Sequence, residues 1–373
     1  MPHPPRDPCR WLAAGQGLAF ATLLGLGAWQ GVTAIGSDAA WTKLRPTLSL
    51  EAFLAGRTTG ALNDIMARHL PADPWLRAAG GLLRWGVFNS GGPQVRIGCN
   101  GWMFLTEELR PWPDPVAAMT ERAEGAAHIA ARLRERGIAL AIALVPDKAR
   151  VEADKLCGAP RAAQAAARFD DFLGALRARG LTAISLLPAL RAAAPSFYRT
   201  DTHWNQAGAA AAAAAIAAAL ADPPLQRAET FATTAAAEAE RPGDLLRLTS
   251  MDRLPDLLRP APDREAPEHT ALAEGAAPSG GLLDEAPAPE VALIGSSYSI
   301  NGNFHGRLQQ DLHSTVVNFG QAGGAFLGAA QTYFASQAFR DSPPKLIIWE
   351  IPERVVAQPL SAEDRHFLAE WQR

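Results

Sequence analysis

The chain has 373 residues, enough for one large domain or two small ones, and its 48% hydrophobic content is typical of a protein with a packed core. Its 35 basic and 38 acidic residues leave a net charge of -3, which provides neither a broad basic surface nor an acidic tail. Nucleic acid is therefore excluded as an expected partner.

The N-terminus carries a pattern typical of membrane targeting. Arg6 and Arg10 precede a mainly apolar stretch over residues 11–35, which only Gln16 and Gln30 interrupt. About 20 apolar residues span the hydrocarbon core of a bilayer, and basic residues flanking such a segment stay on the cytoplasmic side. The pattern predicts that the rest of the chain is exported.

Two interpretations of this segment stay open. In the first, residues 1–36 are an uncleaved signal anchor and residues 37–373 form one exported domain. The apolar stretch favours this because it is longer than the core of a usual signal peptide. In the second, a signal peptide is removed, with Ala34 and Gly36 at positions -3 and -1 of the cleavage site.

The three cysteines are Cys9, Cys99 and Cys157. The last two lie in the exported part, where an oxidising compartment permits a disulfide. Sequence alone leaves both a bonded pair and two free thiols open. Their spacing fits neither a zinc site nor a redox Cys-x-x-Cys motif.

The central part of the chain alternates between helical and strand patterns. Apolar residues recur at helical spacing over 116–136 and 162–179, and continuous apolar runs follow at 138–145 and 181–187. An alanine-rich tract over 207–221 strongly favours helix. This alternation predicts an α/β fold with a largely parallel sheet flanked by helices.

The last third repeats the pattern after a proline-rich stretch, 255–289, that is typical of a linker or loop. Apolar strand-like runs occur at 291–294, 315–319 and 345–349, and each leads into a loop of small or polar residues. In open α/β sheets ligands bind beyond the carboxyl ends of the strands. We therefore expect these loops to form one active-site edge.

The residue types required for serine catalysis are present in the sequence. Ser297 follows the strand-like run 291–294, where its own backbone N–H is a candidate oxyanion donor. Asp201 and His203 are two residues apart, so one short segment can supply both the base and the carboxylate that orients it. Each piece alone has a simpler interpretation, a serine-rich turn or a helix N-cap, so the hypothesis rests on the combination.

Metal chemistry has little support in the sequence. The other seven histidines form no His-x-x-x-His or His-x-His pair, which disfavours a metal hydrolase. We expect no metal and no cofactor.

A family resemblance emerges from six motifs taken in order. The chain resembles the periplasmic alginate O-acetyltransferase family, of the AlgJ and AlgX type, whose catalytic domain is SGNH-hydrolase-like. The motifs are Gly98-Cys-Asn-Gly-Trp-Met-Phe-Leu, Val145-Pro-Asp-Lys-Ala, Asp201-Thr-His-Trp, Gly243-Asp-Leu, Gly295-Ser-Ser-Tyr-Ser and Trp349-Glu-Ile-Pro-Glu-Arg.

The resemblance implies a Ser-His-Asp triad. The family's serine falls on Ser297 rather than Ser296, and its Asp-x-His pair falls on Asp201 and His203. In ordinary SGNH hydrolases the serine comes first and the Asp and His come last. The reversed order here suggests a circularly permuted arrangement of the same site.

The resemblance also suggests residues around the triad. Gly323 or Gly324 corresponds to the glycine block that donates a backbone N–H to the oxyanion. Trp204, which would wall the site, Tyr298 and Arg354 are candidates for substrate binding.

No asparagine follows the last strand, so a side-chain oxyanion donor from that position is not expected. Arg354 either takes an electrostatic role there or pairs with Glu350 or Glu353 to hold the loop.

The function implied is acetyl transfer to an exopolysaccharide through an acetyl ester of the serine. The implied partners are a multispanning membrane O-acyltransferase, which brings the acetyl group across the membrane, and the polysaccharide acceptor. The implied location is the periplasmic side of the inner membrane. A non-catalytic scaffold of a secretion complex and a plain periplasmic deacetylase are the alternatives.

Overall fold

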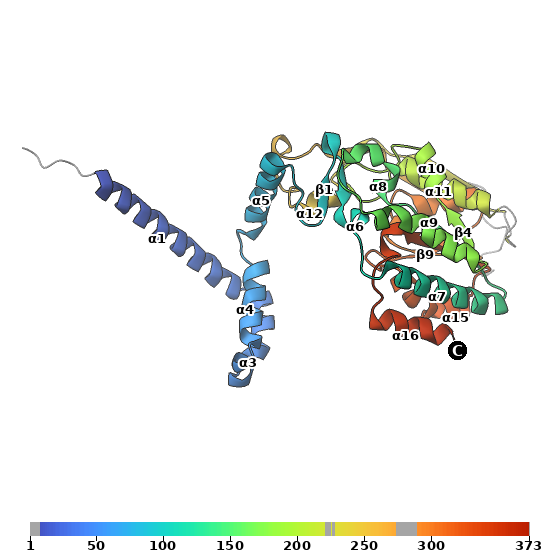
Figure 1. Ribbon diagram of the computed structural model, residues 1–373, viewed down its shortest axis with the longest axis horizontal. Coiled ribbons are helices and arrows are strands. Elements are labelled where there is room, and N and C mark those ends of the chain that lie inside the picture. Colours follow the sequence, from blue (N-terminus) through green and yellow to red (C-terminus); the bar gives the residue numbers. More distant parts are fainter. Residues whose placement is uncertain (1–7, 221–224, 226–227, 274–288, 373) are drawn as a thin grey trace, which may run out of the picture. The chain divides into compact units, whose positions relative to one another are not determined.

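A computed structural model describes residues 8–220, 225, 228–273 and 289–372 (Figure 1). Contacts divide the chain into two compact units. The first runs to Leu83 and includes Arg253–Pro255, and the second holds the remaining residues from Arg84 onward. The boundary expected at 36/37, where the apolar stretch ends, stays a prediction.

The first unit consists of helices. Its first helix contains one segment, Trp11–Ile35, that is long and apolar enough to cross a membrane. Ala34, at the end of this segment, packs with Ala40, Leu44 and Ile65 in a small core. The helices are α1 (Pro8–Ile35), α2 (Asp38–Leu44), α3 (Leu50–Leu54), α4 (Arg57–Arg68) and the start of α5 (Asp73–Phe88), with a 3-10 turn at Arg45–Thr47.

The second unit is built on a five-stranded sheet in which every neighbouring pair is parallel, with the strand order β10-β9-β11-β3-β4. The expected fold class is confirmed, and each strand falls on a segment predicted from its apolar run. The bounds are β3 (Ala139–Val145), β4 (Thr182–Ser185), β9 (Val291–Gly295), β10 (Val316–Gly320) and β11 (Leu346–Pro352).

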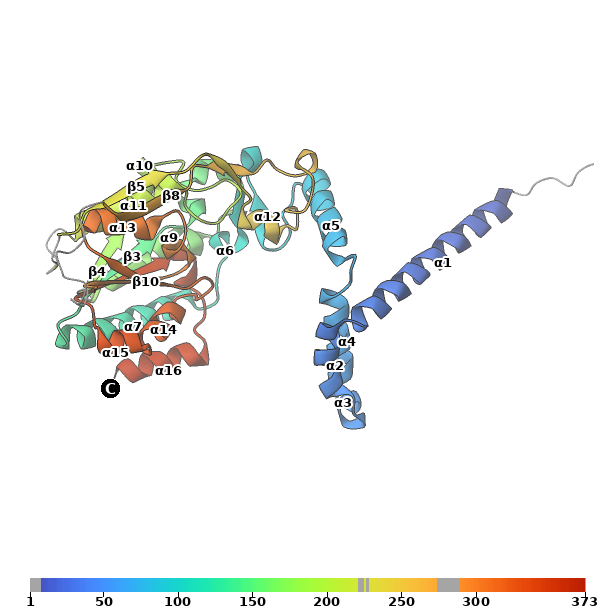
Figure 2. The ribbon, with the colours of Figure 1, turned by 180° about the vertical axis from the view of Figure 1, so that it is seen from behind.

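Helices cover both faces of this sheet (Figures 1 and 2). One hydrophobic cluster joins one face to α7 (Pro115–Glu135), α9 (Ala163–Ala178), α14 (Gly328–Phe334), α15 (Gln337–Asp341) and α16 (Ala362–Trp371). A second cluster joins the other face to α10 (Leu187–Ala192), α11 (Gln206–Ala219) and α13 (Phe304–Leu312).

The side chains of strand β3 pack into hydrophobic clusters on both faces of the sheet. Leu140, Ile142 and Leu144 belong to the first cluster, whereas Ala141 and Ala143 belong to the second. Successive side chains of a strand point to opposite faces, so a strand covered on both faces has no polar side to alternate with.

Short elements surround the sheet. Within the described residues, antiparallel pairs join β1 (Val95–Ile97) with β2 (Met103–Leu105), β5 (Phe231–Ala235) with β8 (Glu268–Leu272), and β6 (Ala239–Arg241) with β7 (Asp263–Glu265). The short helices are α6 (Thr106–Leu109), α8 (Lys148–Val151) and α12 (Asp244–Leu248), and 3-10 turns span Cys99–Gly101, Ala153–Leu156, Asp256–Leu258, Ser297–Ser299 and Glu353–Val355.

The prediction of a linker or loop over 255–289 is therefore wrong for the two strands β7 and β8. Both strands are short, and their pairing partners lie upstream in the chain, so their composition gave no strand signal. Residues 274–288 lie outside the described part of the chain.

The pairing of Cys99 and Cys157, which the sequence left open, is a disulfide with their Cα atoms 5.5 Å apart. It ties the turn after β1 to the segment that follows α8. These two segments are 58 residues apart in the sequence.

Candidate active site

The loop after β9 presents two adjacent serines in different ways. Ser296 is buried and turned inward, where its hydroxyl donates to both carboxylate oxygens of Glu350 at 2.9 and 3.1 Å. Ser297 begins the next turn, and its Oγ lies 2.7 Å from Nε2 of His203. The structure therefore places Ser297, and not Ser296, against the imidazole.

Gly295 allows this turn to form because there is no room for a side chain at its position. A Cβ there would lie 2.4 Å from Oγ of Ser299 and 2.6 Å from Oε2 of Glu350. The same carboxylate accepts hydrogen bonds from the backbone N–H of Ser296 at 2.7 Å and from the Ser299 hydroxyl at 3.0 Å. Burial raises the pKa of Glu350, and the hydrogen bonds from these serines oppose the rise.

Asp201 and His203 form the other half of the site. Oδ1 of Asp201 accepts the backbone N–H of His203 at 2.9 Å and lies 2.6 Å from Nδ1 of its ring. The intervening turn is not helical, since α11 starts only at Gln206, where Asn205 caps it by accepting the N–H of Gly208 at 2.8 Å. Both features match the geometry that the two-residue spacing requires.

The electrostatics set the direction of proton transfer. Burial alone would raise the pKa of Asp201, but hydrogen bonds from His203 and the charges of His203 and Arg241 outweigh burial and lower it well below its usual range. The ionised carboxylate of Asp201 accepts a hydrogen bond, so Nδ1 of the His203 ring carries a proton. Nε2 is then left as the acceptor for the hydroxyl of Ser297.

A pocket of about 210 Å³ opens at Ser297. It is lined by Glu107, Ser296, Ser297, Gly323, Gly324, Ala325, Pro352, Arg354, Val355 and Gln358. The N–H of Gly324 donates to the carbonyl of Gln321 at 3.2 Å, whereas the N–H groups of Ser297 and Gly323 have no recorded acceptor within the described residues. The N–H groups of Ser297 and Gly323 are therefore candidates to donate to a ligand in this pocket.

Comparison with known proteins places this geometry in a family. Residues 95–353 match the family model described as "SGNH hydrolase-like domain, acetyltransferase AlgX". The chain belongs to this family. The expected SGNH-hydrolase-like, largely parallel fold is confirmed by this match.

Curated relatives of this AlgX-family chain include proteins called "Probable alginate O-acetylase AlgJ". The one from Pseudomonas aeruginosa is 32% identical over 345 residues, which cover 87% of each chain. The one from Pseudomonas syringae pv. tomato is 34% identical over 279 residues, 72% of this chain and 70% of the relative.

Two solved structures share the fold. The O-acetyltransferase domain of Pseudomonas putida AlgJ is 31% identical, with a TM-score of 0.64 over 75% of this chain and 99% of that domain. Pseudomonas aeruginosa AlgX is 20% identical, with a TM-score of 0.53 over 71% of this chain and 63% of that one, and this likeness concerns the fold alone.

Within this AlgX-family domain, two aromatic candidates lie away from the pocket. Trp204 is fully buried against Tyr298 and Phe304, with ring centroids 4.9 and 4.8 Å away. Tyr298 is also fully buried, and its hydroxyl donates to the carbonyl of Thr202 at 2.9 Å. The expectation that they bind substrate is corrected, since both are buried outside the pocket and support the Asp-x-His turn.

Arg354 does line the pocket, but its partners differ from those expected. Its Nε lies 3.5 Å from Glu107, and its guanidinium donates to the Tyr298 hydroxyl at 3.4 Å. Glu350 accepts hydrogen bonds from serines and Glu353 pairs with Arg150 at 2.7 Å, and among the described residues no ion pair joins Arg354 to either carboxylate.

Sequence reasoning missed two side chains at the triad. Asp244 places Oδ2 3.7 Å from Nδ1 of His203, and Nη2 of Arg241 lies 3.7 Å from Oδ2 of Asp201. Asp244 stands in the Gly243-Asp-Leu motif, which carried a signal without an assigned role. Arg241 lies in no recognised motif and carried no signal.

A third side chain that sequence reasoning missed, Lys148, supports the Asp-x-His turn. Lys148 is fully buried and its ammonium donates to the carbonyls of Met103, Arg199 and Asp201 at 2.6, 3.0 and 3.0 Å. Burial lowers the pKa of Lys148 to about 8. Lys148 belongs to the Val145-Pro-Asp-Lys-Ala motif. This motif is one of the six that carry the family resemblance, and that was the signal that could have identified Lys148.

Three ligand atoms of Asp201, His203 and Asp244 lie within 4.8 Å of one another, a spacing that a metal ion could use. However, Nδ1 of His203 is hydrogen-bonded to one oxygen of Asp201, and the other oxygen accepts the backbone N–H of Asp244 at 3.1 Å. Metal binding at Nδ1 would break the contact with Asp201 that orients the ring, so this geometry fits proton transfer better.

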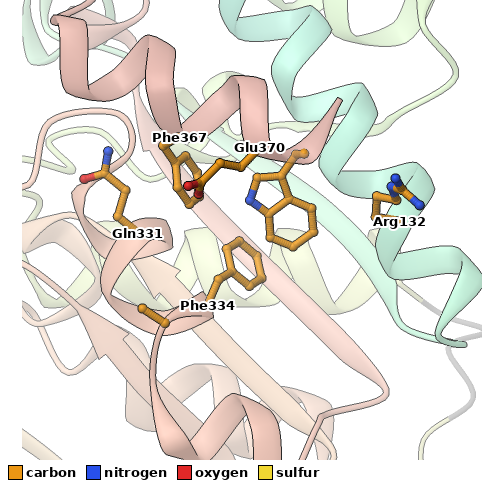
Figure 3. Close-up of a pocket in the computed structure, with 7 residues that line it drawn as sticks. Arg132, Gln331, Phe334, Phe367 and Glu370 are labelled. Carbon is orange, nitrogen blue, oxygen red and sulfur yellow. The ribbon is translucent and has the colours of Figure 1, made fainter. Parts of the chain in front are cut away.

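A larger pocket, of about 480 Å³, lies among α7, α14 and α16 (Figure 3). It is lined by Arg132, Gln331, Phe334, Ala335, Phe367, Glu370 and Trp371. It shares no residue with the pocket at Ser297 and contains neither a nucleophile nor an acid-base pair. Size alone therefore does not locate the reactive centre.

Proposed function

We propose that this protein is a serine-dependent O-acetyltransferase that passes an acetyl group, through an ester of Ser297, to a hydroxyl of an alginate-like exopolysaccharide. The observation that carries the proposal is the 2.7 Å approach of Ser297 Oγ to Nε2 of a histidine that Asp201 orients. The relatives called alginate O-acetylase support the substrate class.

In the first half-reaction Ser297 Oγ attacks the carbonyl carbon of an acetyl donor while His203 Nε2 takes the hydroxyl proton. The negative charge that develops on the acetyl oxygen faces backbone donors. When the tetrahedral intermediate collapses, the bond to the donor's oxygen breaks, and His203 returns its proton to that leaving group. Ser297 then carries the acetyl ester.

In the second half-reaction a sugar hydroxyl replaces the serine as nucleophile. His203 takes the proton of that hydroxyl as the oxygen attacks the acetyl carbon, and returns it to Ser297 Oγ as the ester bond breaks. The buried, ionised Asp201 stabilises the imidazolium in both halves.

For the oxyanion we favour the N–H groups of Ser297 and Gly323. Both line the pocket without a recorded acceptor among the described residues. Gly324 is less suitable because its N–H closes the turn with Gln321. Donors fixed in advance by the backbone stabilise developing charge without reorganisation.

The proposal includes a location and a donor. We infer that α1 is an uncleaved anchor in the inner membrane, with the α/β unit on the periplasmic side, and that a membrane O-acyltransferase supplies the acetyl group. The apolar segment Trp11–Ile35 supports the anchor. Mass spectrometry of the membrane fraction should recover the segment before Ser37, and a soluble form starting there would contradict the anchor.

A plain deacetylase would use the same residues with water in place of the sugar. The two functions separate in an assay with a small acetyl ester and an unacetylated oligouronate acceptor. We expect acetylated oligosaccharide from the wild type and none from Ser297→Ala. Release of acetate from the wild type with no acetylated product would overturn transfer in favour of hydrolysis.

A further inference from the structure

Asp244 makes a reciprocal set of hydrogen bonds with the Asp-x-His turn. Its Oδ1 accepts the backbone N–H of Thr202 at 2.7 Å and the hydroxyl of Thr202 at 3.1 Å. Its own backbone N–H donates to Oδ2 of Asp201 at 3.1 Å. One residue therefore holds the turn from both directions, 43 positions away in the sequence.

The residue before it shows that this close approach is a built feature. A Cβ at Gly243 would lie 1.9 Å from the carbonyl oxygen of Thr200, so only glycine fits there. The same carbonyl accepts the N–H of Leu245 at 3.2 Å. The segment from Gly243 to Leu245 is thus docked by its backbone onto the start of the turn.

These contacts with Asp244 also orient the carboxylate of Asp201, which the two-residue spacing alone does not fix. Asp201 Oδ1 already binds both N–H groups of His203, so the plane of the carboxylate is set by what binds Oδ2. The backbone of Asp244 supplies that bond. The Asp244 side chain fixes Thr202, the single residue that separates the carboxylate from the imidazole.

We propose that Asp244 is a positioning residue of this acetyltransferase, holding Thr202 so that Asp201 and His203 keep the alignment that proton transfer from Ser297 needs. This inference rests on the proposed function. It predicts a loss in kcat rather than in KM, because Asp244 does not line the pocket at Ser297.

The test compares Asp244→Ala with Asp244→Asn in the full-length protein, using a small acetyl ester. Alanine removes the acceptor for Thr202, and we expect kcat to fall about tenfold or more with KM within about twofold. Asparagine keeps an amide oxygen at that place, so kcat should stay within about threefold of wild type.

Asp263→Ala is the matched control. Asp263 accepts the backbone N–H groups of Arg199 and Thr200 at 2.8 Å each, so it supports the same loop without touching Asp201 or His203. We expect this variant to lower the Tm while kcat stays within about threefold of wild type. The low-field proton resonance of His203 Nδ1–H should weaken in Asp244→Ala and persist in the other two variants.

Several outcomes would overturn the proposal. An unchanged kcat in Asp244→Ala, a rise in KM alone, an asparagine variant as slow as the alanine variant, or an equal kcat loss in Asp263→Ala would each do so. Ser297→Ala is measured beside them. If that variant stays active, the proposed function fails instead, whatever the result at Asp244.

Discussion

Ser296 is bound to Glu350 by its backbone N–H at 2.7 Å and by its hydroxyl at 2.9 and 3.1 Å. The nucleophile candidate is the next residue along the chain. The buried carboxylate of Glu350 thus fixes the loop through Ser296, while the hydroxyl of Ser297 contacts His203.

This arrangement separates the two serines experimentally. Ser297→Ala should lower kcat/KM toward a small acetyl ester on the order of 10³-fold or more, because triad members act as a unit. Ser296→Ala should keep most of the activity but lose about 1–3 kcal/mol of stability, since Glu350 loses a donor. An inactive Ser296→Ala beside an active Ser297→Ala would reverse the assignment.

Asp201→Asn should fold normally yet slow kcat on the order of 10³–10⁴-fold. An amide can hold the imidazole but does not stabilise the imidazolium, and it favours the wrong tautomer. Steady-state kinetics together with circular dichroism would check both halves of this prediction. If a folded Asp201→Asn variant keeps wild-type kcat, the site is a Ser–His dyad.

Gly323→Ala should lower kcat by moving a backbone donor. Gly323 has a φ of 75°, which costs a non-glycine residue about 1–2 kcal/mol, although open space surrounds its Cβ position. Gly180→Ala is the control, because Gly180 has a φ of 73° and open space at a helix end away from the pocket. Both variants should lose similar stability, and only Gly323→Ala should lose activity. Equal kcat in the two would remove Gly323 from the oxyanion site.

Glu350 gives the stability a specific pH dependence. Its pKa is raised in the folded state, so the folded protein holds this proton more tightly than the unfolded chain does. Its contribution is fully present below the unfolded pKa of about 4.3 and is lost as the pH rises through the raised folded value.

Urea unfolding of wild type and Glu350→Gln from pH 4 to pH 8 isolates this contribution. Relative to the glutamine variant, the wild type should lose stability as the pH rises through that window. A difference that stays constant with pH, or one that grows in favour of the wild type, would contradict the raised pKa.

Local patterns in the sequence were sufficient to locate the strands of the sheet, whereas the Ser-His-Asp hypothesis needed the combination of distant motifs. The apolar runs located β3, β9 and β11 because strands covered on both faces are built mainly from apolar residues, and a shorter run located the edge strand β10, which is only partly buried. Asn205 caps α11 directly after the non-helical turn that the two-residue spacing of the Asp-x-His pair requires.

What the sequence could not supply depends on contacts between distant segments. Trp204 and Tyr298 were expected in the pocket, but aromatic side chains beside a reactive residue can face either way, and here they pack behind it. Asp244 reaches the triad only because Gly243 docks onto Thr200. The circular permutation suggested by the order of motifs stays a prediction.

The most direct test of the account is to trap the acyl-enzyme. The wild type is mixed with an excess of a small acetyl ester, quenched in acid within one turnover, digested and mapped by mass spectrometry. We predict one acetyl group on Ser297 in the wild type and none at that site in Ser297→Ala. Acetyl on Ser296, or turnover by the wild type with no acetylated serine, would contradict the account.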